Sequence, residues 1–222
     1  MRWLLFSTAN ITCLFFCVSA CFIHLVQMEC VIGLRTDNFC IVAADTRASR
    51  SICTMKHDEE KMFKFSTRIL AAVCGEAGDT NQFSEFIQQN MQLYEIRNGY
   101  ELTPFGAANF TRGNLAKALR SQVCELLYIS HIFCLSLLYD LIIYLFQVPF
   151  AVHGYGSYMS LSVLDRNYRP NMSVDEAVYL VRQCVQEIQK RFVVNLDRYC
   201  VRMVNKDGIT VLPDLVNFAS PA

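Results

Sequence analysis

The sequence predicts a single α+β domain, and three features carry that prediction. The chain has 222 residues, of which 53% are apolar and 18% charged, so it can bury one sizeable core. Apolar residues form short β-prone runs in some segments and recur at helical spacing in others. Turn residues divide these segments into strands, two helices, further strands, one helix and a closing hairpin, an order typical of layered α+β domains.

The first predicted strands lie in the N-terminal third. Residues 31–34 and 39–44 are short apolar runs separated by the polar turn 35–38, a length that joins hairpin strands. Residues 51–54 and 69–74 predict two more strands, and the second ends at the glycine-containing loop 75–78.

Two helices are expected next. With Asp79 or Thr80 as N-cap, apolar residues recur at helical spacing until Asn98-Gly99, which predicts a long amphipathic helix. Thr103 followed by Pro104 is typical of an N-cap with proline at the first helical position. This second predicted helix runs to residue 120.

The C-terminal part predicts one more helix and a hairpin. Ser173 and Glu176 have the spacing of a capping box, in which each side chain binds the other residue's backbone amide. An apolar face then continues from residue 177 to residue 192. Residues 200–204 and 209–212 flank a turn that ends in Gly208, which suits a hairpin.

Charge and cysteine content exclude several classes of function. The chain has 20 basic and 20 acidic residues, so nothing predicts the one-sided basic surface that binds nucleic acid. Its 11 cysteines are odd in number and form no C-x-x-C pair, which favours reduced core or interface thiols. Neither a metal-ligand cluster nor a dinucleotide-binding motif occurs, so no cofactor is expected.

Two apolar stretches differ from the rest of the composition. Residues 3–26 run almost without charge, and residues 123–146 carry only Glu125 and Asp140. Both are near the length that spans a bilayer. The first also has Arg2 ahead of it and small residues at 18–20, the layout of a signal peptide or signal anchor.

Three long collinear segments carry a resemblance to a known family. They are MECVIGLRTDNFCIVAADTRAS, then KHDEEKMFKFSTRILAAVCGEAGDTNQFSEFIQQNMQLYEIRNGYELTPFGAANFTRGNLAKALRS, then PFAVHGYGSYMSLSVLDRNYRPNMSVDEAVYLVRQCVQEIQKRF. These segments resemble the proteasome beta family. Within the family the likeness is greatest to the non-catalytic beta type-2 group. The resemblance implies an αββα sandwich, the N-terminal nucleophile hydrolase fold. It also implies assembly with other beta subunits into rings that alpha rings cover.

The resemblance also implies where an active site would lie. Active members begin with a threonine whose hydroxyl attacks the peptide carbonyl and whose free amine acts as base. In this sequence that position falls on Glu29, which follows Met28. Asp45 and Lys61 fall on the family's aspartate and lysine, and Gly75 on its oxyanion donor. These three vestigial positions also suit an interior ion pair and a simple turn.

Other supporting positions have changed as well. The family's Gly-Ser-Gly appears as residues 154–156 with Tyr155 in the middle, and its later aspartate and serine fall on Phe192 and Asn195. Cys30 would serve as nucleophile only after cleavage behind Glu29. The other candidate bases, His57 and His153, lack a nucleophile motif and are interpreted as surface or loop residues.

Residues 1–27 and 122–148 depart from the family pattern. The first is an atypical extension ahead of the family domain, which we place at residues 28–222. The second replaces two core strands and their glycine-containing turn, so the sequence predicts a disrupted central hairpin. Errors of gene prediction explain both stretches most simply, and a membrane-anchored paralogue is the alternative.

The sequence therefore predicts a non-catalytic structural beta subunit of the 20S proteasome core, in cytoplasm and nucleus. Its expected partners are the other beta subunits and the alpha ring. Two alternatives stay open: a membrane-anchored or mis-assembled paralogue, and an active threonine-type peptidase. Co-migration with a large complex, extraction by detergent, or labelling by a threonine-directed inhibitor would distinguish these three.

Overall fold

The computed structural model describes residues 29–50, 53–75, 77–121, 131–135, 139–140, 146–192 and 196–216. In these residues the chain forms helices and antiparallel sheets that alternate along the sequence, which confirms the α+β class. No helix within the described residues is both long enough and apolar enough to cross a membrane.

One five-stranded sheet has the order β10-β1-β2-β11-β12. Its strands are β1 (Cys30–Arg35), β2 (Cys40–Asp45), β10 (Phe150–Gly154), β11 (Arg198–Asn205) and β12 (Gly208–Val216). β1 and β2 form the predicted hairpin, with Val31 opposite Ala44. β11 and β12 form the predicted closing hairpin, and Gly208 has the positive φ of 136° that its turn requires.

A second five-stranded sheet has the order β5-β6-β7-β8-β9. Its strands are β5 (Met62–Lys64), β6 (Leu70–Cys74), β7 (His131–Leu135), β8 (Tyr139–Asp140) and β9 (Phe146–Gln147). The last three lie in the segment 122–148. β7 pairs with β6 over five residues, and the described residues of β8 pair with β7, with Phe133 opposite Asp140 and Cys134 opposite Tyr139. The described parts of this segment are therefore strands rather than a membrane-spanning helix.

A separate two-stranded ribbon connects the two sheets in sequence. It consists of β3 (Ala48–Arg50) and β4 (Cys53–Lys56). Of the predicted strand 51–54, residues 53 and 54 lie in β4, which continues to Lys56, and residues 51–52 lie outside the described part.

Four helices are described: α2 (Ala77–Asn98), α3 (Pro104–Ser121), α4 (Ser157–Asn167) and α5 (Val174–Arg191). The predicted N-cap of α2 was wrong, since the helix begins at Ala77 and Asp79 lies in its first turn, where a carboxylate favours the helix dipole. The capping box at Ser173 and Glu176 is confirmed. α4 has no counterpart among the predicted elements.

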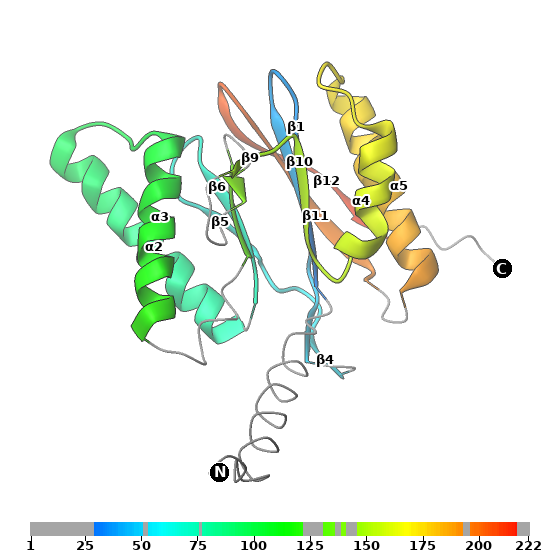
Figure 1. Ribbon diagram of the computed structural model, residues 1–222, viewed down its shortest axis with the longest axis horizontal. Helices are drawn as coiled ribbons and strands as arrows, with labels where there is room; N and C mark the ends of the chain where they lie inside the picture. The colour runs from blue at the N-terminus through cyan, green and yellow to red at the C-terminus, as the bar shows by residue number, and fades with distance from the viewer. Residues whose placement is uncertain are drawn as a thin grey trace, which may run out of the picture.

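The helices lie outside the sheets. In Figure 1, α2 and α3 flank the sheet that contains β5 and β6, while α4 and α5 flank the sheet that contains β1 and β11. Side chains alternate accordingly along each strand. Ile32 belongs to the cluster with α4 and α5, whereas Val31 joins a cluster with residues of β5 and β6. Val73 belongs to the cluster with α2 and α3.

Candidate functional site

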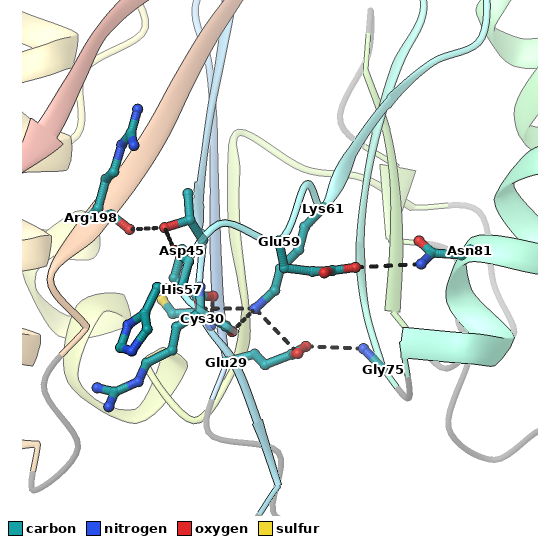
Figure 2. A network of polar contacts seen from close by, with 11 residues as sticks. Glu29, Cys30, Asp45, His57, Glu59, Lys61, Gly75, Asn81 and Arg198 are labelled. Carbon is teal, nitrogen blue, oxygen red and sulfur yellow. Dashed lines mark hydrogen bonds and ion pairs between the residues drawn. The ribbon is translucent and has the colours of Figure 1, made fainter. Parts of the chain in front are cut away.

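Four residues that the sequence singles out meet at one end of the two sheets. Glu29 directly precedes β1 and Asp45 ends β2, whereas Lys61 directly precedes β5 and Gly75 directly follows β6. Because both strand pairs are antiparallel, the start of one strand lies beside the end of its partner. Figure 2 shows the resulting polar network, with Lys61 between Asp45 and Glu29, and Glu29 between Lys61 and Gly75.

The ammonium group of Lys61 is the centre of this network. Its Nζ lies 2.8 Å from Asp45 Oδ2 and 3.2 Å from Glu29 Oε1. It also donates to the backbone carbonyl of Arg47 at 2.8 Å. The side chains of Lys61, Asp45 and Glu29 are 5%, 0% and 8% exposed. The predicted interior ion pair between Asp45 and Lys61 is therefore present, and Glu29 joins it.

The two carboxylates also accept backbone hydrogen bonds. Gly75 N donates to Glu29 Oε2 at 3.1 Å. Cys30 N donates to Asp45 Oδ1 at 2.8 Å, and Arg47 N donates to Asp45 Oδ2 at 3.2 Å. Charged acceptors strengthen such bonds. The network thus joins the segments before β1 and after β2 to those before β5 and after β6.

Burial and the charge of the ion-pair partner shift the pKa values of Lys61 and Glu29 in opposite directions. Burial alone lowers the pKa of Lys61, but the carboxylates of Asp45 and Glu29 raise that pKa more, and the net shift is upward. Lys61 therefore stays protonated. Burial raises the pKa of Glu29, and the nearby Lys61 offsets only part of this effect. Two carboxylates share one lysine here, so the Lys61 charge and the Gly75 amide compensate the second negative charge in part.

Cys30 does not have the surroundings of a nucleophile. Its side chain is fully buried, and burial raises the pKa of its thiol well above the usual value. Since the thiolate is the reactive form, this position keeps the sulfur unreactive. Free thiols are found at Cys30, Cys40, Cys53, Cys74, Cys184 and Cys200.

The two candidate histidines occupy different environments. His57 is exposed after β4, as predicted, and its carbonyl accepts a hydrogen bond from the Thr46 hydroxyl at 2.9 Å. The interpretation of His153 as a surface or loop residue was wrong. It is 7% exposed within β10, because β10 pairs with β1 and is covered by the rest of the domain.

The residues at the altered supporting positions form an aromatic contact. The rings of Tyr155 and Phe192 lie with centroids 5.5 Å apart, and Tyr155 lies equally far from Tyr158. Beside them the backbone is tightly packed. A Cβ atom on Gly154, whose φ is 77°, would lie 2.7 Å from the carbonyl carbon of Glu29. Asn195 lies outside the described residues.

Little space remains beside the Glu29 carboxylate. The cavity next to it, which Lys61, Gly75, Glu59 and residues of β5 and α2 also line, has a volume of about 20 Å³. That is room for one water molecule, and a peptide side chain does not fit. Nor do three or more metal-ligating side chains gather anywhere in the described part of the chain.

Sequence reasoning missed two participants in the network. Arg47 contributes its backbone carbonyl. Because every residue has this group, the sequence does not reveal which one takes part. Cys74 is buried at the end of β6, and its thiol pKa is raised, first by burial and then by the charge of Glu29. The position of Cys74 directly before Gly75 was the available signal.

Comparison with known proteins places this arrangement in a family. The proteasome subunit family matches residues 27–204. Proteasome subunit beta type-2-A of Arabidopsis thaliana is 46% identical to the chain over 82% of this chain and 91% of the relative. The chain belongs to the proteasome beta-subunit family. The resemblance in the sequence is thereby confirmed.

Two further relatives of this beta subunit show how sequence identity varies among the matches. Proteasome subunit beta type-2 of Oryza sativa subsp. japonica is 44% identical over 82% of this chain and 88% of its own length. Proteasome subunit beta type-4 of Saccharomyces cerevisiae is 37% identical over 84% and 98%. The family match includes residues 122–148 of this beta subunit and leaves out residues 1–26.

Proposed function

We propose that the chain is a non-catalytic subunit of the 20S proteasome core, where it contributes to the beta ring around the proteolytic chamber. The observation that carries this proposal is the position of Glu29. At this position, which the resemblance assigns to the nucleophile, the Glu29 carboxylate binds both Lys61 and the Gly75 amide. A carboxylate buried in this way has neither the hydroxyl nor the free amine that threonine catalysis requires.

The surroundings of Glu29 support the same proposal. Gly75 N, the oxyanion donor that the resemblance implies, already donates to the Glu29 carboxylate. The adjoining cavity of about 20 Å³ leaves no room for a substrate side chain. Tyr155 and Phe192 replace polar groups of active members with packed rings. This position therefore offers neither a nucleophile of the threonine type nor space for a substrate side chain.

The arrangement of elements supports the four-layer αββα architecture. Helices lie on the outer face of each five-stranded sheet in Figure 1, and buried residues of β1, β2, β5 and β6 form a shared cluster. The described parts of the segment 122–148 add β7, β8 and β9 to the second sheet. We expect the subunit to contact other beta subunits and the alpha ring, in cytoplasm and nucleus.

Native size fractionation of the full chain with mass spectrometry of co-migrating proteins tests this proposal. We expect co-migration with the other proteasome subunits. A threonine-directed covalent inhibitor should label catalytic subunits of the same fraction and leave this chain unlabelled. A labelled, processed N-terminus on this chain would overturn the non-catalytic assignment, and a free monomer would overturn the ring assignment.

The departures at residues 1–27 and 122–148 require a separate test. Transcripts should be mapped across residues 27, 121 and 149. Reads that are interrupted at these boundaries would support an error of gene prediction, whereas continuous reads through all three would contradict it. Detergent-dependent extraction of the full chain would instead support the membrane-anchored alternative.

A further inference from the structure

We propose that the Gly75 amide and the Lys61 ammonium form an anion-binding site for a small monocarboxylate, and that Glu29 occupies it as an internal ligand. This inference goes beyond the ring-subunit role, because it concerns what the site binds rather than where the subunit assembles. The two oxygens of the Glu29 carboxylate are divided between the two donors, at 3.2 Å from Lys61 Nζ and 3.1 Å from Gly75 N.

Both donors are held in place without Glu29. Lys61 Nζ keeps its contacts with Asp45 Oδ2 and the Arg47 carbonyl, each at 2.8 Å. The segments that carry the donors are also joined, since Val73 N donates to the Lys61 carbonyl at 2.9 Å. Removing the Glu29 side chain therefore leaves two oriented donors, and a preorganised site loses little free energy in ordering itself.

The charges around the site select the kind of anion. The Asp45 carboxylate already compensates the positive charge of Lys61. An additional anion must therefore be held by the Gly75 amide and by its own contact with the Lys61 ammonium group. A dianion such as phosphate would leave a second uncompensated charge in a buried place. α2 begins two residues after Gly75, and the positive end of a helix dipole favours a single negative charge nearby.

The size of the site sets an upper limit on the ligand. Substituting Glu29 with alanine removes one methylene and one carboxylate group, which together correspond to acetate. The adjoining cavity adds only about 20 Å³. Acetate therefore fits the space that this substitution opens, whereas the branched carboxylate pivalate does not.

The test is chemical rescue of the full-length Glu29→Ala variant. Its unfolding is measured in sodium acetate and, at equal concentration and ionic strength, in sodium pivalate. Acetate should stabilise the variant and pivalate should not. Above the Kd of acetate, each tenfold increase in its concentration should raise the folding equilibrium constant about tenfold. The parent chain should respond equally to both salts, because Glu29 fills its site.

Two control variants assign the effect to the site. Glu29→Ala combined with Lys61→Met should lose the difference between acetate and pivalate. Glu187→Ala removes a carboxylate outside the site, which pairs with Lys190 and Arg191, and should show no preference for acetate. Equal effects of the two salts on Glu29→Ala would overturn the proposal, and so would an acetate preference in the parent chain.

A second pair of variants covers the case in which Glu29→Ala does not fold. Glu29→Gln keeps an oxygen that can accept the Gly75 hydrogen bond, whereas Glu29→Leu is similar in size and has none. Glu29→Gln should unfold at a higher urea concentration than Glu29→Leu, and equal midpoints would overturn the proposal. Co-migration with proteasome subunits is measured separately on each variant, so failure of this inference is distinguishable from failure of the proposed function.

Discussion

Lys61 makes polar contacts across the two sheets. Its ammonium group has three acceptors, and all three lie at the ends of β1 and β2: Glu29 directly before β1, Asp45 at the end of β2, and the Arg47 carbonyl just after it. All three donors of a lysine are therefore used. The residue is 6% exposed, so a substitution would leave two buried carboxylates without their counter-charge.

We expect Lys61→Met to destabilise the subunit strongly. Removing one partner of a buried ion pair costs roughly 3–5 kcal/mol, because the remaining charge stays buried and unpaired. Urea unfolding of the full chain measures this loss. Lys190→Met is the matched control, since Lys190 pairs with Glu187 but its side chain is 68% exposed. Similar losses from both variants would contradict the role given to Lys61.

The raised pKa of Glu29 predicts a pH dependence of stability. Burial is the cause of the shift, and the charged or titratable groups that influence Glu29 are Lys61, Asp45 and Cys74. Between the ordinary glutamate pKa of 4.5 and the raised value, the folded chain binds more protons than the unfolded chain. Stability should therefore fall as pH rises through this window.

Glu29→Gln should remove that part of the pH dependence. The neutral amide does not titrate, so the free energy of unfolding of this variant should change less above pH 4.5 than that of the parent chain. Urea unfolding at a series of pH values measures both slopes. An equally steep fall in the variant would show that another group causes the dependence.

Sequence reasoning predicted which residues meet in the site but not which of them contact one another. The resemblance placed Asp45, Lys61, Gly75 and Glu29 at matching positions, and the structure brings all four together. That Glu29 would bind both donors depends on side-chain length and direction across two sheets, which spacing does not determine. The prediction that His153 lies on the surface or in a loop was wrong for a related reason, since neighbouring strands decide whether a strand residue is buried.

At the scale of elements, the helices and hairpins whose ends are marked by capping or turn residues were predicted best. The α5 capping box and the glycine-containing turn between β11 and β12 both mark boundaries with side-chain chemistry. α4 was missed because its sequence SYMSLSVLDRN shows a weak apolar pattern, with only Ser160 and Leu164 buried. β7 was hidden within the long apolar stretch 123–146, where strand and helix look alike.

Gly156 provides a test of how closely the start of α4 packs against β1. A Cβ atom there would lie 2.9 Å from Cys30 Cβ and 3.0 Å from Ile188 Cδ1. We expect Gly156→Ala to cost about 1–3 kcal/mol of stability through overpacking. Chemical denaturation measures the change.

Gly113→Ala is the matched control for this substitution. Gly113 lies within α3 and a Cβ atom there meets nothing within 4 Å. Alanine should stabilise the helix by about 0.5–1 kcal/mol. If both variants change stability in the same direction, close packing at Gly156 is not the reason for its effect.

At the scale of the whole molecule, three hydrophobic clusters follow the layers of the two sheets and their helices. One cluster contains residues from β1, β2, β5, β6 and β10, and the outer clusters add α2 and α3 on one side and α4 and α5 on the other. The family match begins at residue 27, so assembly surfaces shared with relatives lie after it.

Deleting residues 1–27 should therefore preserve co-migration with the other proteasome subunits. The shortened chain begins at Met28 and keeps almost the whole range that matches the family. Native fractionation of tagged full-length and shortened chains compares the two. Loss of co-migration in the shortened chain alone would show that the extension takes part in assembly.

The pairing of β1 has a consequence for synthesis on the ribosome. β1 lies between β2 and β10, and Cys30 pairs with Gly154. While the chain is being made, one edge of β1 stays without its partner until residue 154 has emerged. A nascent chain that stalls after α3 would thus display an unpaired apolar strand edge, the kind of surface on which chains aggregate and chaperones act.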